Sequence, residues 1–246
     1  MKSAGAPATT HAVLFDAYGT LFDVYSVCAV AEQLFPGRSE ALTQLWRDKQ
    51  IEYSRLTSMS ERYRPFWELT RAGLRFAAAR LGLALTVEGE AELLGAYRHL
   101  AAFPEIKPVL QALKARGIVT GILSNGDPEM LAVAVRSAGL FDERGRPLLD
   151  HVLSVDAVQR YKTDPAAYAL GVEAVGRPAR QILFVSSNGW DAIGATWYGY
   201  STLWVNRYRL PLEALDTEPT RMGSSLRDVL EFFPVPTKPS HKESRP

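Results

Sequence analysis

Short apolar runs, punctuated by Gly, Asn or Asp, recur along the chain. Five of them have the length of a strand: 11–15, 118–123, 151–155, 182–185 and 202–205. Continuous apolar runs bounded by turn residues are typical of parallel strands that are buried on both faces. The pattern therefore predicts a central parallel sheet.

Helical patterns lie between the later runs, and they occupy 104–117, 128–139 and 165–176. Strands that alternate with helices predict an α/β fold with a doubly wound parallel sheet, a Rossmann-like core. Asp127 and Asp164 each precede a proline, so each is predicted to cap a helix that begins with that proline. Gly139 suits the end of the second helix.

The stretch between the first and second predicted strands holds about ninety residues, far more than a crossover connection needs. It is rich in helix formers, Arg and aromatic residues, so we interpret 23–103 as an inserted helical cap domain. The core domain is then 11–22 together with 104–233. Residues 1–10 and 234–246 have little to bury and are predicted to be flexible tails.

Charge and composition narrow the possible partners. The formal net charge is +1, from 28 basic and 27 acidic residues, which gives no broad attraction to nucleic acid or to a membrane surface. No uninterrupted apolar stretch reaches the length of a membrane-spanning helix, and Met1–Thr10 lacks the apolar core of a signal peptide. The single cysteine, Cys28, fits a reducing compartment. We expect a cytoplasmic protein that binds a small molecule.

Polar residues gather after four of the apolar runs. In an open parallel sheet, ligands bind beyond the carboxyl ends of the strands. The segments that this rule selects are 16–20, 124–126, 161–164 and 186–191. We expect them to form one site.

The first of these segments contains a candidate nucleophile, Asp16. A lone Asp after a strand more often caps the next turn, but 15–23 (FDAYGTLFD) resembles the first motif of the haloacid dehalogenase superfamily, and specifically of its L-2-haloacid dehalogenases. The loop 124–126 resembles the second motif, Lys162 the third, and 186–191 the fourth. Four motifs in the right order are far more specific than one.

Two other functions are alternatives to a dehalogenase. Phosphatases of the superfamily carry a second Asp where this chain has Tyr18, and paired acidic residues where it has Ser187 and Asn188. A divalent cation prefers several carboxylate oxygens, so a metal-dependent phosphatase or phosphonatase is disfavoured, and neither metal nor cofactor is expected. A silent ligand-binding member is the other alternative. It is disfavoured because the chain carries all of Asp16, Arg47, Lys162, Asn188 and Asp191.

The resemblance implies a covalent mechanism. Asp16 would attack C2 of an (S)-2-haloalkanoic acid and displace halide with inversion, and water would hydrolyse the ester to an (R)-2-hydroxyalkanoic acid. Thr20 would orient the nucleophile, although it could simply cap the turn. Asn188 would bind the Asp16 oxygen or a developing oxyanion.

Further roles follow from the same resemblance. Lys162 would replace a metal as counter-charge, with Tyr168 and Asp191 holding it in place. Asp191 would also orient the hydrolytic water. The alternative is that Lys162 is an exposed loop residue. Thr163 stands where a proline commonly follows this lysine.

The substrate carboxylate is expected at the second loop. Ser124 and Asn125 lie just before a predicted helix, where free backbone N–H groups and the helix dipole favour an anion. A polar turn without a ligand is the alternative. Ser186 belongs to the fourth motif and is also predicted to contact substrate.

Arg47 is the candidate halide acceptor. Helical spacing puts Arg47, Ile51 and Ser54 on one face of the first long cap helix and puts the following residues on the other: Leu42, Leu45, Trp46, Tyr53 and Leu56. Pattern alone favours a solvated Arg47, but 45–50 resembles the cap segment of the family. Asp48 departs from it, since glutamine is common there.

The remaining expectations also depend on the resemblance. Tyr18, Ile51, Phe66 and Trp190 would form an apolar wall around the substrate carbon chain, although each could equally be a core residue. The resemblance further implies a homodimer.

Overall fold

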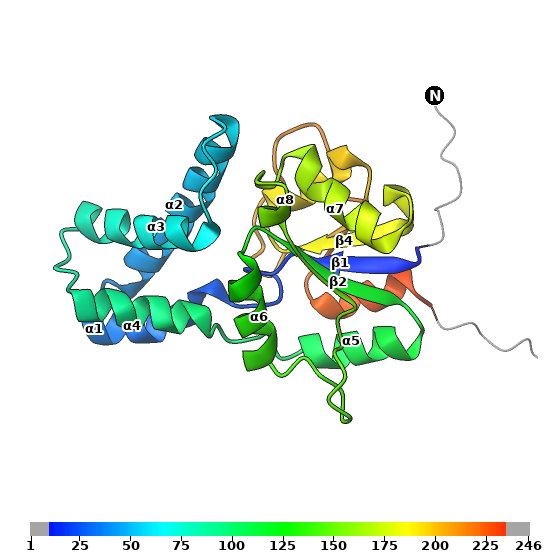
Figure 1. Ribbon diagram of the computed structural model, residues 1–246, viewed down its shortest axis with the longest axis horizontal. Helices are drawn as coiled ribbons and strands as arrows, with labels where there is room; N and C mark the ends of the chain where they lie inside the picture. The colour runs from blue at the N-terminus through cyan, green and yellow to red at the C-terminus, as the bar shows by residue number, and fades with distance from the viewer. Residues whose placement is uncertain (1–9, 235–246) are drawn as a thin grey trace, which may run out of the picture.

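The computed structural model describes residues 10–234, so the two predicted tails lie almost wholly outside the described residues. Its centre is a six-stranded parallel sheet in the order β3-β2-β1-β4-β5-β6 (Figure 1). The strand bounds are β1 Ala12–Phe15, β2 Val119–Ser124, β3 His151–Ser154, β4 Ile182–Ser186, β5 Ser201–Val205 and β6 Arg221–Gly223. The five predicted strands are present. The pattern missed β6, because three residues with two exposed side chains make no apolar run.

The register of the sheet brings the predicted loops together. Phe15 at the end of β1 is level with Ile122 of β2 and with Val185 of β4. The residues that follow these three strands therefore leave the sheet at the same edge, in its middle. This confirms the expectation that the loops after β1, β2 and β4 meet.

Helices cover both faces of this sheet (Figure 1). They are α5 Ile106–Ala115, α6 Pro128–Ser137, α7 Pro165–Val175 and α8 Gly189–Tyr198, with the 3-10 helices η2 Val155–Ala157, η3 Ala179–Gln181 and η4 Leu226–Phe232. The three predicted helices are present within about two residues at each end. The pattern did not predict α8, because the first turn of this helix falls in the polar segment 186–191.

The two capping predictions had different outcomes. Asp164 caps α7, since its Oδ1 accepts the Ala166 N–H at 2.8 Å. Asp127 makes no side-chain capping bond to α6, so that prediction was wrong. Its carboxylate instead accepts the N–H groups of Phe66 and Trp67, at 2.7 and 2.8 Å. The Asp127 carboxylate binds two N–H donors at the first turn of α3 in place of the N–H groups of α6. These two hydrogen bonds tie α3 to the core.

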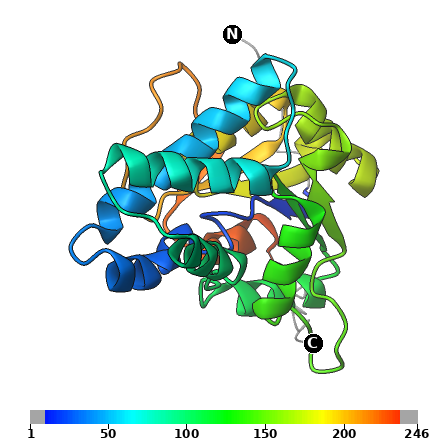
Figure 2. The same ribbon diagram turned by 60° about the vertical axis from the view of Figure 1, so that its left-hand side comes forward.

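Most of the segment between β1 and β2 forms a separate group of helices, which lies to one side of the sheet in Figure 1 and comes forward in Figure 2. It contains η1 Val24–Val27, α1 Cys28–Leu34, α2 Ser39–Met59, α3 Phe66–Arg80 and α4 Val87–Arg98. The chain leaves and re-enters the core at one place, because Phe22 and Ala102 form an antiparallel bridge. We refer to this group as the cap and propose 23–103 as its limits.

The buried face of α2 differs from the predicted one. Leu42 and Trp46 are buried as expected, but Leu56 is 59% exposed. Ser54, which was assigned to the face of Arg47, is buried instead. Its hydroxyl donates to the Ile51 carbonyl at 2.9 Å, and Gln50 donates to Thr70 Oγ1 at 2.9 Å. Hydrogen bonds let these polar residues pack against α3, which hydrophobic periodicity cannot detect.

Among residues 10–234, no helix combines the length and the apolar character needed to cross a membrane.

Candidate active site

Asp16 follows the last residue of β1 and is 6% exposed. Its two carboxylate oxygens have different surroundings. Oδ2 accepts hydrogen bonds from Thr20 Oγ1 at 2.9 Å, Asn188 Nδ2 at 2.8 Å and Ser186 Oγ at 3.5 Å. Oδ1 accepts one from Lys162 Nζ at 3.1 Å. One oxygen is thus held by three donors, while the other keeps lone pairs for chemistry.

The loop after β1 explains how Thr20 reaches back to Asp16. Gly19 has φ of +91°, a backbone conformation that side chains disfavour. Around it the N–H groups of Leu21 and Phe22 both donate to the Ala17 carbonyl, at 2.9 and 3.0 Å. This tight turn returns the Thr20 hydroxyl to the carboxylate four residues earlier.

Lys162 is buried between two carboxylates. Its ammonium nitrogen lies 3.1 Å from Asp16 Oδ1 and 3.0 Å from Asp191 Oδ2, and the Tyr168 hydroxyl donates to Asp191 Oδ1 at 2.7 Å. The backbone N–H of Lys162 donates to Asn125 Oδ1 at 3.0 Å. The expectation of a buried, partnered lysine is therefore correct, and the exposed-loop alternative is not.

Burial and charge act together on this cluster. Burial lowers the pKa of Lys162, but the adjacent carboxylates of Asp16 and Asp191 outweigh it, so the pKa is raised overall. Burial raises the pKa of Asp191, and the charge of Lys162 and the hydrogen bond from Tyr168 oppose this only in part. The lysine is therefore held as an ammonium.

Helix α8 approaches the lysine loop very closely. A Cβ atom on Gly194 would lie 2.5 Å from Thr163 Cγ2 and 2.7 Å from the Tyr168 hydroxyl. Only glycine fits at this position without displacing a neighbour. Thr163, the departure from the family pattern, packs here against α8.

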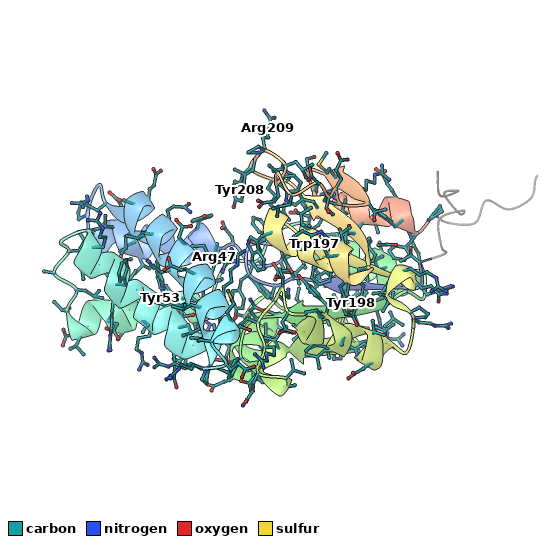
Figure 3. The ribbon with its side chains drawn as sticks, turned by 90° about the horizontal axis from the view of Figure 1, so that it is seen from above. Arg47, Tyr53, Trp197, Tyr198, Tyr208 and Arg209 are labelled. Atoms are coloured by element: carbon teal, nitrogen blue, oxygen red, sulfur yellow. The ribbon has the colours of Figure 1, made fainter. Side chains whose placement is uncertain are left out.

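Arg47 reaches from α2 of the cap to the loops of the core. Its Nη2 donates to the Tyr18 carbonyl at 3.1 Å and to Asn188 Oδ1 at 3.4 Å. Figure 3 shows Arg47 at the border between the cap helices and the core. The face of α2 that carries Arg47 therefore looks toward the cleft. Asp48 is exposed and accepts a hydrogen bond from Gln44 Nε2 at 2.9 Å, so it turns away from Asp16.

The four predicted wall residues fall into two pairs. Tyr18 and Phe66 are buried, with ring centroids 6.0 Å apart. Ile51 and Trp190 instead line a hollow of about 510 Å³ between α2 and α8. The Tyr18 ring fits because Gly126 has no side chain: a Cβ there would lie 2.6 Å from Tyr18 Cε2.

The second loop is built around Ser124 and Asn125. Ser124 is buried and its Oγ accepts the Gly126 N–H at 3.1 Å, while Asn125 holds the Lys162 backbone. Ser154 Oγ donates to the Gly126 carbonyl at 2.7 Å. Hydrogen bonds thus join this loop to β3 and to the lysine loop.

Comparison with known proteins identifies the family. A model of haloacid dehalogenase-like hydrolases matches residues 10–199. The chain belongs to the haloacid dehalogenase-like hydrolases. An (S)-2-haloacid dehalogenase of Pseudomonas sp. (strain YL) is 44% identical over 221 residues, which cover 90% of this chain and 93% of that protein. The family and the fold class predicted from the sequence are both confirmed, and the chain is a hydrolase of this family.

Solved structures agree with this assignment. An L-2-haloacid dehalogenase superposes with a TM-score of 0.88 at 58% identity, covering 92% of this chain and 99% of that one. The L-2-haloacid dehalogenase of Xanthobacter autotrophicus with covalently bound chloropropionic acid superposes with a TM-score of 0.82 at 37% identity, covering 90% and 97%.

The donor set does not fit the magnesium ion that phosphatases of the haloacid dehalogenase superfamily use. The Lys162 ammonium already lies between the carboxylates of Asp16 and Asp191. Within residues 10–234, no three His, Cys, Asp or Glu side chains are grouped as metal ligands. The phosphatase acid–base position holds Tyr18, whose pKa burial raises well above its usual value. These side chains therefore do not form a magnesium site.

Sequence reasoning missed two groups near the site. Tyr97 of α4 stacks on the Tyr18 ring, with centroids 5.8 Å apart and planes 15° apart. Arg207 bonds Glu105 Oε1 at 2.5 Å and the Thr20 carbonyl at 3.4 Å. Tyr97 is an isolated aromatic in a helical pattern, so no sequence signal marked it. A charged residue shortly after β5 was the available hint for Arg207.

Proposed function

We propose that this hydrolase cleaves the carbon–halogen bond of short (S)-2-haloalkanoic acids and forms (R)-2-hydroxyalkanoic acids and halide through an ester of Asp16. The observation that carries the proposal is the Lys162 ammonium, which bridges Asp16 and Asp191 where a metal-dependent enzyme needs a cation. A relative named an (S)-2-haloacid dehalogenase, which aligns over 90% of this chain and 93% of its own length, supports it.

In the first step Oδ1 of Asp16 attacks C2, since Oδ2 is occupied by three hydrogen-bond donors. The C2–halogen bond breaks as the Oδ1–C2 bond forms, with inversion at C2. Halide carries the bonding electrons away and needs no proton. The Arg47 guanidinium accepts it, because charge that develops on the leaving group is stabilised by nearby donors.

In the second step water attacks Cγ of the Asp16 ester. The Cγ–Oδ1 bond breaks, so Oδ1 leaves in the product hydroxyl and the water oxygen stays on Asp16. During this step Oδ2 becomes an oxyanion, which the Thr20 hydroxyl and the Asn188 amide already contact at 2.9 and 2.8 Å. Asp191, whose pKa burial raises, orients the water and takes up one of its protons, which it returns to Oδ1 as the Cγ–Oδ1 bond breaks. The second proton of the water leaves the Asp16 carboxyl for solvent, so the carboxylate is regenerated.

The substrate carboxylate binds at the second loop. Ser124 Oγ accepts the Gly126 N–H, so its own hydrogen is available for a carboxylate oxygen, and Asn125 offers its amide. Ser186 completes this polar side. Tyr18 and Phe66 give the carbon chain an apolar surface of limited size, which favours short acids.

Incubation with each enantiomer of 2-chloropropionate in EDTA tests the proposal. We expect chloride from the (S) enantiomer only and (R)-lactate as product. Absence of chloride from both enantiomers, with phosphate released from phosphoesters once magnesium is added, would establish the phosphatase instead.

We further propose a homodimer in the cytoplasm. The dimer rests on the family resemblance alone, and the compartment rests on the single free cysteine, Cys28. Light scattering on the eluting protein measures the assembly directly, and a monomer mass at micromolar concentration would refute the dimer.

A further inference from the structure

Arg55 of α2 contacts the core at the edge of the cleft. Its guanidinium carbon lies 4.9 Å from the centroid of the Trp190 ring, and Trp190 is in the first turn of α8. This cation–π contact joins the cap to the core next to Asn188, whose amide binds Asp16. Arg55 itself is exposed to solvent.

Two hollows meet at Arg55. The first, of about 510 Å³, is lined by Ile51 and Trp190, and the second, of about 440 Å³, by Lys162 and Thr163. Arg55 lines both. The second hollow borders the loop that carries Lys162, whose side chain is itself buried, and the first borders Trp190, two residues after Asn188. Arg55 lies where the two hollows meet.

Most other charged groups of these two hollows are already neutralised. Glu52 pairs with Lys49 at 2.7 Å, and Arg160 pairs with Glu61 at 2.9 Å. Lys162 is held by the two carboxylates described above.

Two acidic groups remain. Asp164 caps the start of α7 through its side chain, and Asp48 bonds the amide of Gln44. Within residues 10–234, Arg55 has no carboxylate at salt-bridge distance, so its guanidinium keeps donors for an anion from solution.

The overall charge makes such a local cation important. A net charge of +1 cannot draw an anionic substrate over long distances. An exposed guanidinium at the edge of a cleft acts within about 10 Å at 0.1 M salt. A carboxylate that comes within this distance of the cleft edge is therefore attracted by Arg55.

We propose that Arg55 is a capture residue, whose guanidinium first binds the carboxylate of an incoming short 2-haloacid. Stacking on Trp190 holds the Arg55 guanidinium between the two hollows. The identity of the substrate rests on the proposed function. The capture of a short carboxylate by this arginine does not depend on the later chemistry.

Steady-state kinetics with (S)-2-chloropropionate tests the capture role. R55Q is compared with R55K, which keeps the charge, and with R80Q, which removes an exposed arginine at the far end of α3. At about 0.01 M ionic strength we expect R55Q to lower kcat/KM about fivefold, with kcat much less affected. At about 1 M the difference disappears, because the Debye length falls to about 3 Å. We expect R55K and R80Q to stay near the wild type.

Two results would overturn the proposal: R55Q and R80Q behave alike, or R55K loses as much kcat/KM as R55Q. Calorimetric titration with propionate, an unreactive carboxylate, gives a readout that needs no turnover. We expect Kd about fivefold weaker in R55Q alone at low salt. If the wild type released no chloride, the proposed function would fail. The titration would still decide the capture role, and equal Kd values for all variants would refute it.

Discussion

The two sides of the active site are held very differently. On the core side, Asp16, Lys162 and Asp191 are 6%, 1% and 0% exposed, and hydrogen bonds of 3.1 Å or less join them. On the cap side, Arg47 is only partly buried and makes bonds of 3.1 and 3.4 Å to the core. The core thus fixes Asp16, the proposed nucleophile, before substrate arrives, while the cap offers a cation whose contacts could be exchanged for the proposed halide.

Replacing Asp16, the proposed nucleophile, has the largest expected effect on activity. We expect D16N to lower kcat by about 10⁴-fold or more, since an amide does not form the ester. D23N is the matched control: Asp23 caps η1 by accepting the Tyr25 N–H at 2.9 Å, and asparagine caps as well as aspartate. Chloride release measures both variants. A D16N protein with more than a tenth of wild-type activity would refute the nucleophile assignment.

A substitution on the cap side should lower kcat less than D16N does. A lysine at position 47 keeps the charge but loses the planar group that contacts Tyr18 and Asn188 together, so we expect R47K to lower kcat about 10²-fold. R38K serves as control, because Arg38 bonds the Leu81 carbonyl within the cap. Unchanged kcat in R47K would mean that another group accepts the halide.

The link between Tyr168 and Asp191 can be tested through pH. The hydrogen bond from Tyr168 favours the Asp191 carboxylate and lowers its pKa, against the larger raising effect of burial. Y168F removes that bond, so Asp191 is protonated at a higher pH and the acid limb of kcat/KM shifts upward. We expect a drop of roughly tenfold at acid pH and little change at pH 8. The Tyr198 ring in α8 packs 5.7 Å from the Tyr168 ring but makes no hydrogen bond to Asp191, so Y198F should leave the profile in place.

The alkaline side of the same profile reports on Lys162. Because the pKa of Lys162 is raised above 10.5, its charge is present at lower pH and is lost only as pH rises through the raised value. A decline of activity near pH 8 that disappears in K162R would contradict this.

Substitution of Asp48 has the smallest expected effect on kcat/KM. Its exposed carboxylate lines the hollow beside Trp190 and repels an anionic substrate. D48N should raise kcat/KM about twofold at low salt and leave it unchanged at about 1 M ionic strength. A decrease would show that the carboxylate supports the cap structure through Gln44.

Some residue positions could be predicted from the sequence and others could not. Apolar runs and the position of strand ends were sufficient to place Asp16, Ser124, Lys162 and Asn188 at one edge of the sheet. Apolar periodicity could not place Ser54, because hydrogen bonds rather than hydrophobicity bury it.

For a related reason, the sequence could not predict hydrogen-bond partners that lie far apart in the chain. Asp127 binds a helix start sixty residues away, and Arg207 binds Glu105 across the chain. Such pairings depend on tertiary geometry. The roles of the site residues came from the family resemblance and stay proposals.

A single turnover in H₂¹⁸O tests the central claim most directly. With enzyme in excess over (S)-2-chloropropionate, Asp16 supplies the hydroxyl oxygen of lactate and takes its replacement from water. Mass spectrometry should then find ¹⁸O in the peptide that contains Asp16 and none in the lactate. Label in the lactate of that first turnover would show that water attacks C2 directly, and the covalent mechanism would be wrong.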